Sequence, residues 1–328
     1  MTMLKNDRIF VAGHSGLVGS AIVKNLREKG YTNLLTQDRS ELDLLNQSAV
    51  ENFFSTEKPD IVFLAAAKVG GIFANNTYRA DFIYQNLQIQ NHVIYSAHLF
   101  GVKRLIFLGS SCIYPRNAPQ PMKEEDLLTG ALEQTNRPYA LSKIAGLELV
   151  NAIRRQHGKD FFSVMPTNLY GPGDNFHPEN SHVLPALIHR FHEAKISNAK
   201  EVIVWGTGSP KREFMYSEDC ADAIVFLAET LKEDFFEKDI KQAQLGNSHV
   251  NVGTGEELTI KELTEIIRNV VEFRGKIIFD ATKPDGPPKK LLDTHLLTAL
   301  GWKKKISLKE GVQSVYAYYT DCNRFVNA

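Results

Sequence analysis

A tyrosine and a lysine four residues apart form the most chemically suggestive pair in the sequence. Tyr139 and Lys143 would share one face of a helix, because residues i and i+4 are neighbours there. Tyrosine, with an ordinary pKa of about 10, is a poor proton donor near neutral pH, and a nearby ammonium lowers that pKa. Such a tyrosine could exchange a proton with a substrate oxygen during hydride transfer. The alternative is two unrelated residues on a helix surface.

A hydroxyl and a thiol follow one of the apolar runs. Ser110 and Cys112 come directly after Leu105 to Leu108, which we predict to be a strand. In an open parallel sheet, ligands bind at the carboxyl ends of the strands, so we expect Ser110 to meet Tyr139 there. A free cysteine is most often a small buried hydrophobe. We adopt that interpretation for Cys220 and Cys322, but Cys112 beside Ser110 is a candidate for acid–base chemistry.

A glycine-rich turn follows the first predicted strand and opens the first predicted helix. Gly13, Gly16 and Gly19 have the spacing G-x-x-G-x-x-G. Small residues let the backbone approach a pyrophosphate, and the helix N-terminus offers free N–H groups. The context favours a dinucleotide site over an ordinary strand-to-helix turn.

The end of the second predicted strand carries both an acid and a base. Asp38 would bind an adenosine ribose and favour NAD, whereas Arg39 would accept the 2′-phosphate of NADP. A solvated charged turn is the alternative, and it is as good an interpretation for Asp38 as ribose binding.

Strands and helices alternate through the first half of the chain. Predicted strands are Ile9 to Ala12, Leu34 to Thr36, Ile61 to Ala65, Leu105 to Leu108 and Phe161 to Met165, and predicted helices include Leu17 to Lys29, Ala80 to Leu99 and Tyr139 to Gln156. Near-continuous apolar strands predict an α/β fold with a doubly wound parallel sheet of the Rossmann type.

The pattern changes after Met165. Pro166 to Asn180 is rich in Pro, Gly and Asn and predicts a long irregular segment, and shorter alternating elements follow it. We expect residues 1–165 to form an NADP-binding domain, with 214–253 a candidate to rejoin it, and 166–328 to form mainly a smaller mixed α/β substrate domain. With 328 residues, the chain is long enough for two cores.

Composition excludes several classes of protein. Lys plus Arg and Asp plus Glu are equal at 38 each, so the charge of a nucleic-acid binder is absent. No apolar stretch reaches the roughly 18 residues of a membrane span, and we expect a cytoplasmic protein. Four histidines (His177, His182, His189 and His192) raise a zinc hypothesis, but no thiolate or carboxylate completes a recognisable ligand spacing, so we predict no metal.

These motifs resemble the extended short-chain dehydrogenases/reductases that act on nucleotide sugars. Five further segments are similar to the GDP-L-fucose synthase family, whose members are 3,5-epimerases and 4-reductases: Ala65 to Ile72, Gly109 to Pro115, Pro166 to Pro172, Asn175 to Pro178 and Lys283 to Gly286. The resemblance covers nearly the whole chain, from Ile9 to about Tyr319.

The resemblance implies a role for particular residues. Tyr139, Lys143 and Ser110 would carry out reduction, and Cys112 and His182 would exchange protons at the sugar carbons. The implied cofactor site consists of Gly13, His14, Ser15, Gly16, Leu17, Val18, Gly19, Arg39, Lys143, Pro166, Thr167, Asn168, Leu169 and His182. Arg190, Trp205, Arg212 and Asp285 would contact GDP or the sugar.

The implied cofactor is NADP(H), and the implied substrate is GDP-4-keto-6-deoxy-D-mannose. The family often has an arginine in the glycine turn where this chain has Ser15, so selection of NADP would rest on Arg39, helped by His14. The C4 ketone of that substrate acidifies the protons at C3 and C5, so one site could epimerise and then reduce. The family also implies a homodimer, for which Ala80 to Leu99 and Tyr139 to Gln156 are candidate interface helices.

Two other functions compete with this one. A related 4,6-dehydratase would carry Asp-Glu after the strand-end hydroxyl residue, where this chain has Ser111-Cys112, and a simple 4-epimerase is the other enzymatic alternative. A non-catalytic NADP-sensing regulator could use the same fold. Such a regulator would not need Tyr139, Lys143, Ser110 and Cys112 together. Trp205 could equally be a core residue, and Arg212 a surface charge.

Overall fold

A six-stranded parallel sheet forms the larger part of the molecule. The computed structural model describes residues 3–177, 181–236, 248–283 and 285–326, without the side chains of 322–326. The sheet order is β2-β1-β3-β4-β5-β9, made by β1 (Ile9–Ala12), β2 (Leu34–Leu35), β3 (Ile61–Leu64), β4 (Arg104–Leu108), β5 (Asp160–Pro166) and β9 (His249–Val252). Strand order changes direction between β1 and β3, which is where such sheets bind ligands at their carboxyl ends.

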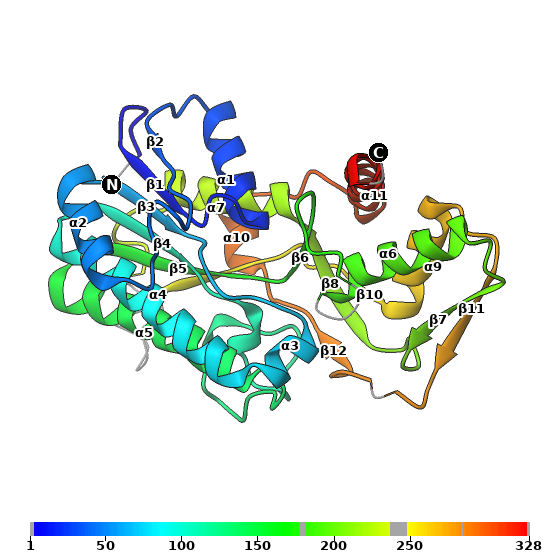
Figure 1. The fold of residues 1–328 in the computed structure, drawn as a ribbon. Coiled ribbons are helices and arrows are strands. Elements are labelled where there is room, and N and C mark those ends of the chain that lie inside the picture. Colours follow the sequence, from blue (N-terminus) through cyan, green and yellow to red (C-terminus); the bar gives the residue numbers. More distant parts are fainter. Residues whose placement is uncertain (1–2, 178–180, 237–247, 284, 327–328) are drawn as a thin grey trace.

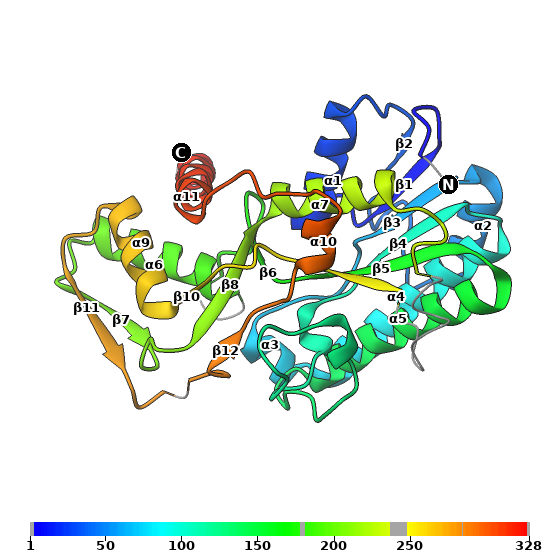
Figure 2. The same cartoon turned by 180° about the vertical axis from the view of Figure 1, so that it is seen from behind.

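Helices cover both faces of this sheet (Figures 1 and 2). One face carries α1 (Leu17–Glu28), α7 (Ser217–Thr230) and α10 (His295–Ala299), and the other carries α2 (Gln47–Glu57), α4 (Arg79–Leu99) and α5 (Arg137–His157). Every residue of β1, β3, β4 and β5 is buried, which explains why these strands are apolar runs and do not alternate with polar residues. The predicted doubly wound parallel sheet is confirmed.

The chain leaves this sheet after β5 and returns to it later. Helix α7 packs beside α1, where the amide of Asn25 donates to Asp222 at 3.2 Å. Strand β9 then pairs in parallel with β5, from Ser163 opposite His249 to Pro166 opposite Val252. A segment far along the chain therefore completes the sheet.

A smaller group of elements lies beside the large sheet (Figure 1). Its strands are β6 (Asn168–Tyr170), β7 (Glu201–Trp205), β8 (Lys211–Tyr216), β10 (Glu257–Thr259), β11 (Lys276–Asp280) and β12 (Lys289–Lys290), and its helices are α6 (Val183–Ile196), α9 (Ile260–Val271) and α11 (Leu308–Val326). Strand β8 pairs with β6 and β12 in parallel and with β10 in antiparallel. The three helices and the strands other than β12 share a third apolar core. Among the described helices, none is long and apolar enough to cross a membrane.

One expectation about the chain after β5 is wrong in part. The segment predicted to be irregular, Pro166 to Asn180, contains β6, which pairs Asn168 with Phe214 of β8. A strand of three residues is too short to produce a periodic pattern, and its partner is distant in sequence. Residues 178–180 lie outside the described part of the chain.

A buried ion pair joins the sheet to α7. The guanidinium of Arg104 donates to the Asp160 carboxylate at 2.8 Å and 2.5 Å, and also to the carbonyl groups of Ala228 and Leu231. Arg154 of α5 approaches the same carboxylate at 3.5 Å. All three charged side chains are buried, so each depends on the others for solvation.

We expect Asp160→Ala to lower the free energy of unfolding by about 3 to 5 kcal/mol, because it leaves two buried guanidinium groups without their carboxylate. Glu218→Gln removes the exposed partner of Lys24 and should cost less than about 1 kcal/mol. Urea unfolding of both variants measures the difference. Equal, small effects would show that the buried pair contributes no more than a surface pair.

Candidate active site

The glycine turn brings α1 close to the ends of β1 and β3. Gly13 has φ +83°, and a Cβ there would lie 2.7 Å from the backbone of Ala66. A Cβ on Gly19 would lie 2.0 Å from the carbonyl oxygen of Gly13. Gly16 precedes α1 as its N-cap and offers no side-chain hydrogen bond, and the first turn of α1 contains no acidic residue. The turn therefore leaves backbone N–H groups for an anion and has no side chain to block its approach.

Two polar side chains of this turn differ in their surroundings. Ser15 is exposed, and His14 is half-buried. Among the described residues, Nδ1 of His14 is buried and has no hydrogen-bond partner. A dinucleotide fits this cradle because the glycines clear its path and α1 directs its N-terminus towards it.

The charged residues after β2 have different partners. Asp38 accepts hydrogen bonds from the Ser40 hydroxyl at 2.6 Å and the Ser40 N–H at 2.8 Å, and the hydroxyl contributes most to lowering the pKa of Asp38. These bonds place Asp38 in a charged turn, which was the alternative to ribose binding. The side chain of Arg39 is 76% exposed, with Asp43 at 3.8 Å.

Ser110, Tyr139 and Lys143 lie together at the carboxyl end of β4. Ser110 is hydrogen-bonded to the Tyr139 hydroxyl, and the Lys143 ammonium lies 5.9 Å from the centre of the tyrosine ring. Phe82 of α4 packs edge-on against that ring. Helix α5 presents both Tyr139 and Lys143 on the same face, as their spacing predicts.

The direction of the Tyr139 pKa shift is not the predicted one. Burial raises the pKa of Tyr139 well above its ordinary value, and this outweighs the hydrogen bond from Ser110, which lowers it. Burial also lowers the pKa of Lys143 to about 8. The sequence prediction that lysine lowers the tyrosine pKa is wrong for this structure, because desolvation of the phenol is the larger effect.

The Cys112 thiol lies beside this group. The backbone N–H of Cys112 donates to the Ser110 hydroxyl at 3.4 Å, in a short 3-10 turn formed by Ser111–Ile113. Burial raises the pKa of the Cys112 thiol, whereas the charge of Lys290, a hydrogen bond from Ser110 and the charge of Lys143 act to lower it. Two cations therefore favour its thiolate. Cys220 is buried in the core under α7, and the side chain of Cys322 lies outside the described residues.

Sequence reasoning missed Lys290. Strand β12 pairs with β8 and sets Lys290 opposite Arg212. The Lys290 ammonium acts electrostatically on Cys112 and also lowers the pKa of His182. Burial in turn lowers the pKa of Lys290. The pairing of two strands that are distant in sequence places this lysine where its charge acts on the thiol, and no local pattern predicts that pairing.

The candidate histidines separate into two sets. His182 is the residue before α6; it remains solvent-accessible but is surrounded by protein, and this desolvation is the main cause that lowers its pKa. His189 and His192 instead form hydrogen bonds with Tyr319 and Tyr316 of α11. In the described part of the chain, no three His, Cys, Asp or Glu side chains are grouped so as to hold a metal ion.

Trp205 is not a core residue. It ends β7 with 62% of its surface exposed, and the side chains of Arg190 and Lys283 lie 5.6 Å and 5.8 Å from its ring. Arg190 donates to the carbonyl oxygen of Ile203 at 2.7 Å, which holds α6 to β7. The interpretation of Trp205 as packing is therefore wrong, and its open face is available for a planar ligand.

Arg212 and Asp285 lie near the turn that follows Trp205. Asp285 accepts from the N–H and hydroxyl of Thr207 at 3.0 Å and 2.7 Å, and its charge acts on Arg212. Burial lowers the pKa of Arg212, which is half-buried and so is not an ordinary surface charge. Pro284 lies outside the described residues.

The predicted cofactor segment after β5 is held by backbone contacts. The N–H of Thr167 donates to the carbonyl oxygen of Val252 at 3.0 Å. The side-chain amide of Asn168 donates to the carbonyl oxygen of Glu213 at 2.8 Å. Pro166 ends β5, and Leu169 packs against the core beneath α7. The segment thus joins the large sheet to β8.

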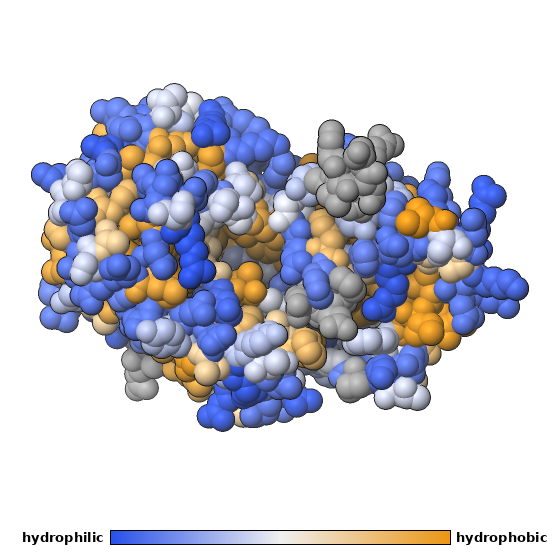
Figure 3. Space-filling model, viewed as in Figure 1, coloured by the Kyte–Doolittle hydropathy of each residue, from blue (hydrophilic) through white to orange (hydrophobic). Residues whose placement is uncertain are grey.

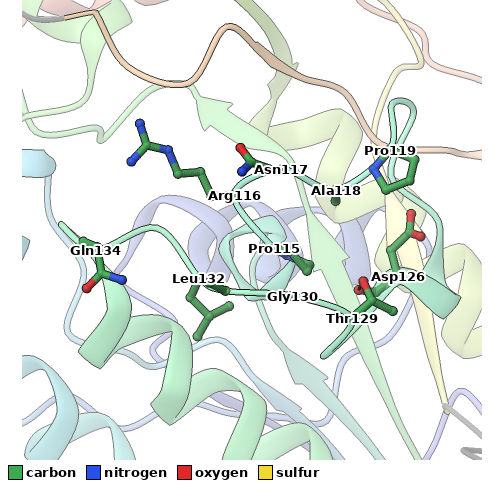
Figure 4. A pocket seen from close by; sticks show the side chains of 11 residues that line it. Pro115, Arg116, Asn117, Ala118, Pro119, Asp126, Thr129, Gly130, Leu132 and Gln134 are labelled. Atoms are coloured by element: carbon green, nitrogen blue, oxygen red, sulfur yellow. Dashed lines mark hydrogen bonds between the residues drawn. The ribbon is translucent and has the colours of Figure 1, made fainter.

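The molecular surface is hollowed between the large sheet and the smaller group of elements (Figure 3). A separate hollow of about 680 Å³ lies in the loop that leads from the Cys112 turn to α5. Figure 4 shows Arg116 and Asn117 along one side of it and Leu132 and Thr129 along the other. Neither Ser110, Cys112 nor Tyr139 lines it, so it lies beside the reactive group and does not enclose it.

Comparison with known proteins gives consistent matches. The chain is 60% identical over 317 residues to a putative GDP-L-fucose synthase 2 of Arabidopsis thaliana, covering 97% of this chain and 93% of the relative. It is 53% identical over 318 residues to a GDP-L-fucose synthase of Escherichia coli strain K12, covering 97% and 98%. A solved GDP-mannoheptose C4 reductase from Campylobacter jejuni with NADP bound is 40% identical, with a TM-score of 0.86 and coverage of 97% and 99%.

A family model matches most of the chain. The model of the NAD dependent epimerase/dehydratase family matches residues 9–253, which span the glycine turn, Ser110, Tyr139, Lys143 and the last strand of the large sheet. The residues brought together at the carboxyl ends of β1, β3 and β4 therefore lie inside the matched region, and the chain belongs to the NAD dependent epimerase/dehydratase family.

Proposed function

We propose that this protein is a GDP-L-fucose synthase, which epimerises GDP-4-keto-6-deoxy-D-mannose at C3 and C5 and then reduces C4 with NADPH. The observation that carries the proposal is the Cys112 thiol, placed against Ser110 and under the charges of Lys143 and Lys290. A reductase needs only the tyrosine, lysine and serine. Burial raises the pKa of the Cys112 thiol, and the two nearby cations oppose that effect, so the same place offers a further group for proton abstraction.

Epimerisation is the first proposed reaction. The C4 ketone delocalises charge onto O4, so a proton can leave C3 or C5 as an enolate forms. At each of the two carbons, Cys112 would remove one proton and His182 would return one from the opposite face of the sugar. The raised pKa of Tyr139 keeps its hydroxyl protonated, so that it can donate a hydrogen bond to the enolate oxygen.

Reduction then uses the same ketone. NADPH, when bound, supplies the hydride to C4. Tyr139 would give its proton to O4, and Ser110 would hold that oxygen in place. Lys143, with a pKa near 8, would stabilise the resulting tyrosinate.

The nucleotide would bind across the smaller group of elements. Trp205 offers an exposed ring on which a guanine can stack, and Arg212 offers a guanidinium for phosphate. Arg190 would support Trp205 through its cation–π contact. Asp285 would keep the turn after Trp205 in position through Thr207.

We propose NADPH as the preferred cofactor and a homodimer as the working form. Arg39 is exposed, with Asp43 at 3.8 Å, and its guanidinium can reach a 2′-phosphate, whereas Asp38 is engaged by Ser40. Helix α4 exposes Tyr84, Tyr95 and Leu99, a surface that a second copy could cover. Light scattering on the purified protein tests the dimer.

Incubation with GDP-4-keto-6-deoxy-D-mannose and NADPH tests the proposed function directly. We expect NADPH oxidation and a single product, GDP-L-fucose, identified by NMR. UDP-sugar ketones should not be turned over. A product with unchanged configuration at C3 and C5 would show a simple reductase, and no product would overturn the proposal.

We predict that Cys112→Ser suppresses deuterium incorporation at C3 and C5 by about 10² or more, because a serine hydroxyl is far less acidic than a thiol. Slow NADPH oxidation should remain, giving product that is not epimerised. NMR in D₂O measures both. Cys220→Ser, which changes a buried cysteine outside the site, should exchange as wild type does. Normal exchange in Cys112→Ser would place the base elsewhere.

We predict that Lys290→Met raises the pKa of Cys112 further, because it removes a charge that favours the thiolate. The pKa of His182 should also rise, since the same charge lowers it. The pH dependence of Cys112 alkylation by iodoacetamide, followed by mass spectrometry, measures the first shift. Lys289→Met is the matched control, because Lys289 pairs with Glu257 at 3.0 Å. Identical pH profiles of alkylation for the wild type, Lys290→Met and Lys289→Met would contradict the prediction.

We predict that Arg39→Ala raises the KM for NADPH about tenfold and leaves the KM for NADH nearly unchanged, because only NADPH has the 2′-phosphate. Initial rates with each cofactor measure this ratio, and NADH serves as the internal control. Equal effects on both cofactors would indicate that Arg39 stabilises the turn and does not select NADP.

A further inference from the structure

A buried carboxylate on β8 has no part in the chemistry described above. Glu213 is 0% exposed and follows Arg212 on the central strand of the smaller sheet. One carboxylate oxygen accepts the backbone N–H groups of Thr254 at 2.6 Å and Gly255 at 2.8 Å. The other accepts the N–H of Leu292 at 3.1 Å. Three backbone dipoles from two segments therefore solvate this charge.

The chain leaves space for this carboxylate. Gly253, at the end of β9, would place a Cβ 2.4 Å from an oxygen of Glu213, so no larger residue fits there without displacement. The backbone carbonyl of Glu213 also accepts the Asn168 amide at 2.8 Å. One residue thus joins β8 to the end of β9, to β6 and to the segment that contains Leu292.

That segment carries Lys290. Strand β12 pairs with β8 over two residues, Lys289 opposite Lys211 and Lys290 opposite Arg212. Leu292 lies just beyond this short ladder, where Glu213 holds its N–H. On the opposite side, the N–H of Leu291 donates to the Gln120 side chain at 2.8 Å. The backbone around Lys290 is fixed between Glu213 and the loop that contains Gln120.

We infer that Glu213 is a positioning residue, whose carboxylate holds the backbone after Lys290 and so keeps the Lys290 ammonium within electrostatic reach of Cys112. This inference rests on the proposed electrostatic role of Lys290, and it does not require that the substrate be a GDP-sugar. The carboxylate does not touch the reacting atoms. It acts through Leu292 on a lysine two residues earlier.

The charged and titratable groups around the thiol define the system to be measured. Lys290, Ser110 and Lys143 act on Cys112, and Cys112 in turn acts on Tyr139. Lys290 is itself influenced by the further groups Arg212 and Glu133, and it acts on His182. Glu213 binds the backbone N–H of Leu292, so we expect its effect on the thiol to pass through the position of Lys290.

Glu213→Gln is the principal test. If the amide oxygen of the glutamine keeps the hydrogen bonds from the N–H groups of Thr254 and Gly255, its NH₂ group faces the N–H of Leu292. Two hydrogen-bond donors then face and repel each other. We expect the pKa of Cys112 to rise, and the rate of its alkylation at pH 7 to fall about three- to tenfold. Loss of a negative charge would by itself lower a thiol pKa, so the sign of the shift separates a displaced Lys290 from a direct charge effect.

Two further variants sharpen the test. Glu213→Asp keeps the charge but is one methylene shorter, so it should lose the hydrogen bond from the N–H of Leu292. The pKa of Cys112 should then rise, as in Glu213→Gln. Glu257→Gln is the matched control: Glu257 lies opposite Glu213 on β10 but binds the side chains of Lys211 and Lys289. We expect a wild-type alkylation profile for this control. Thermal melting and NADPH binding, measured on each variant, report the integrity of the fold.

The double variant Glu213→Gln/Lys290→Met shows whether Glu213 acts on the thiol through Lys290. We expect it to match Lys290→Met alone, because Glu213 has nothing to position once the ammonium is gone. An unchanged alkylation profile in Glu213→Gln and Glu213→Asp, with or without a lower melting temperature, would overturn the inference. So would a shift that adds fully to that of Lys290→Met. Turnover of GDP-4-keto-6-deoxy-D-mannose by the wild-type protein tests the proposed function separately.

Discussion

A single buried ammonium joins the sheet to the helix that carries the reactive tyrosine. Lys143 is 3% exposed, and its Nζ donates to the carbonyl oxygen of Leu108, the last residue of β4, at 2.8 Å. This bond fixes α5 at the carboxyl end of the sheet, so Tyr139, one turn earlier, meets Ser110. The ammonium has left water, which lowers its pKa to about 8, and it favours anions placed beside it. Burial raises the pKa of the Cys112 thiol, and the charge of Lys143 is one of the effects that oppose this rise.

The second cation reaches the thiol from the other group of elements. Lys290 arrives on β12, a strand of two residues that pairs with β8 beside Arg212. Burial disfavours the thiolate of Cys112, and two ammonium groups from different parts of the fold oppose that penalty. In the proposed reaction, the large sheet supplies the hydride-transfer group, and the smaller group of elements supplies the nucleotide contacts and the charge that activates the base. One ketone can then undergo both reactions without leaving the site.

Local sequence predicted those parts of the molecule whose signal lies within a few residues. The apolar runs of β1, β3, β4 and β5 are continuous because both faces of the sheet are covered, and Tyr139 and Lys143 share a helix face because of their spacing. Lys290 could not be found in this way, since two residues of strand carry no periodicity and their partner is far along the chain. The direction of the Tyr139 pKa shift depends on burial, which spacing does not reveal. Trp205 is as apolar as a core residue, and only the fold exposes it.

We propose that two separable groups act on one ketone, Cys112 with His182 for proton exchange and Tyr139 with Ser110 and Lys143 for reduction. Incubation of Tyr139→Phe with GDP-4-keto-6-deoxy-D-mannose and NADPH in D₂O tests it most directly, with deuterium at C3 and C5 and NADPH oxidation followed in the same sample. We predict continued deuterium incorporation while NADPH oxidation falls by about 10² to 10⁴. Loss of both activities to the same extent, or normal oxidation of NADPH, would contradict it.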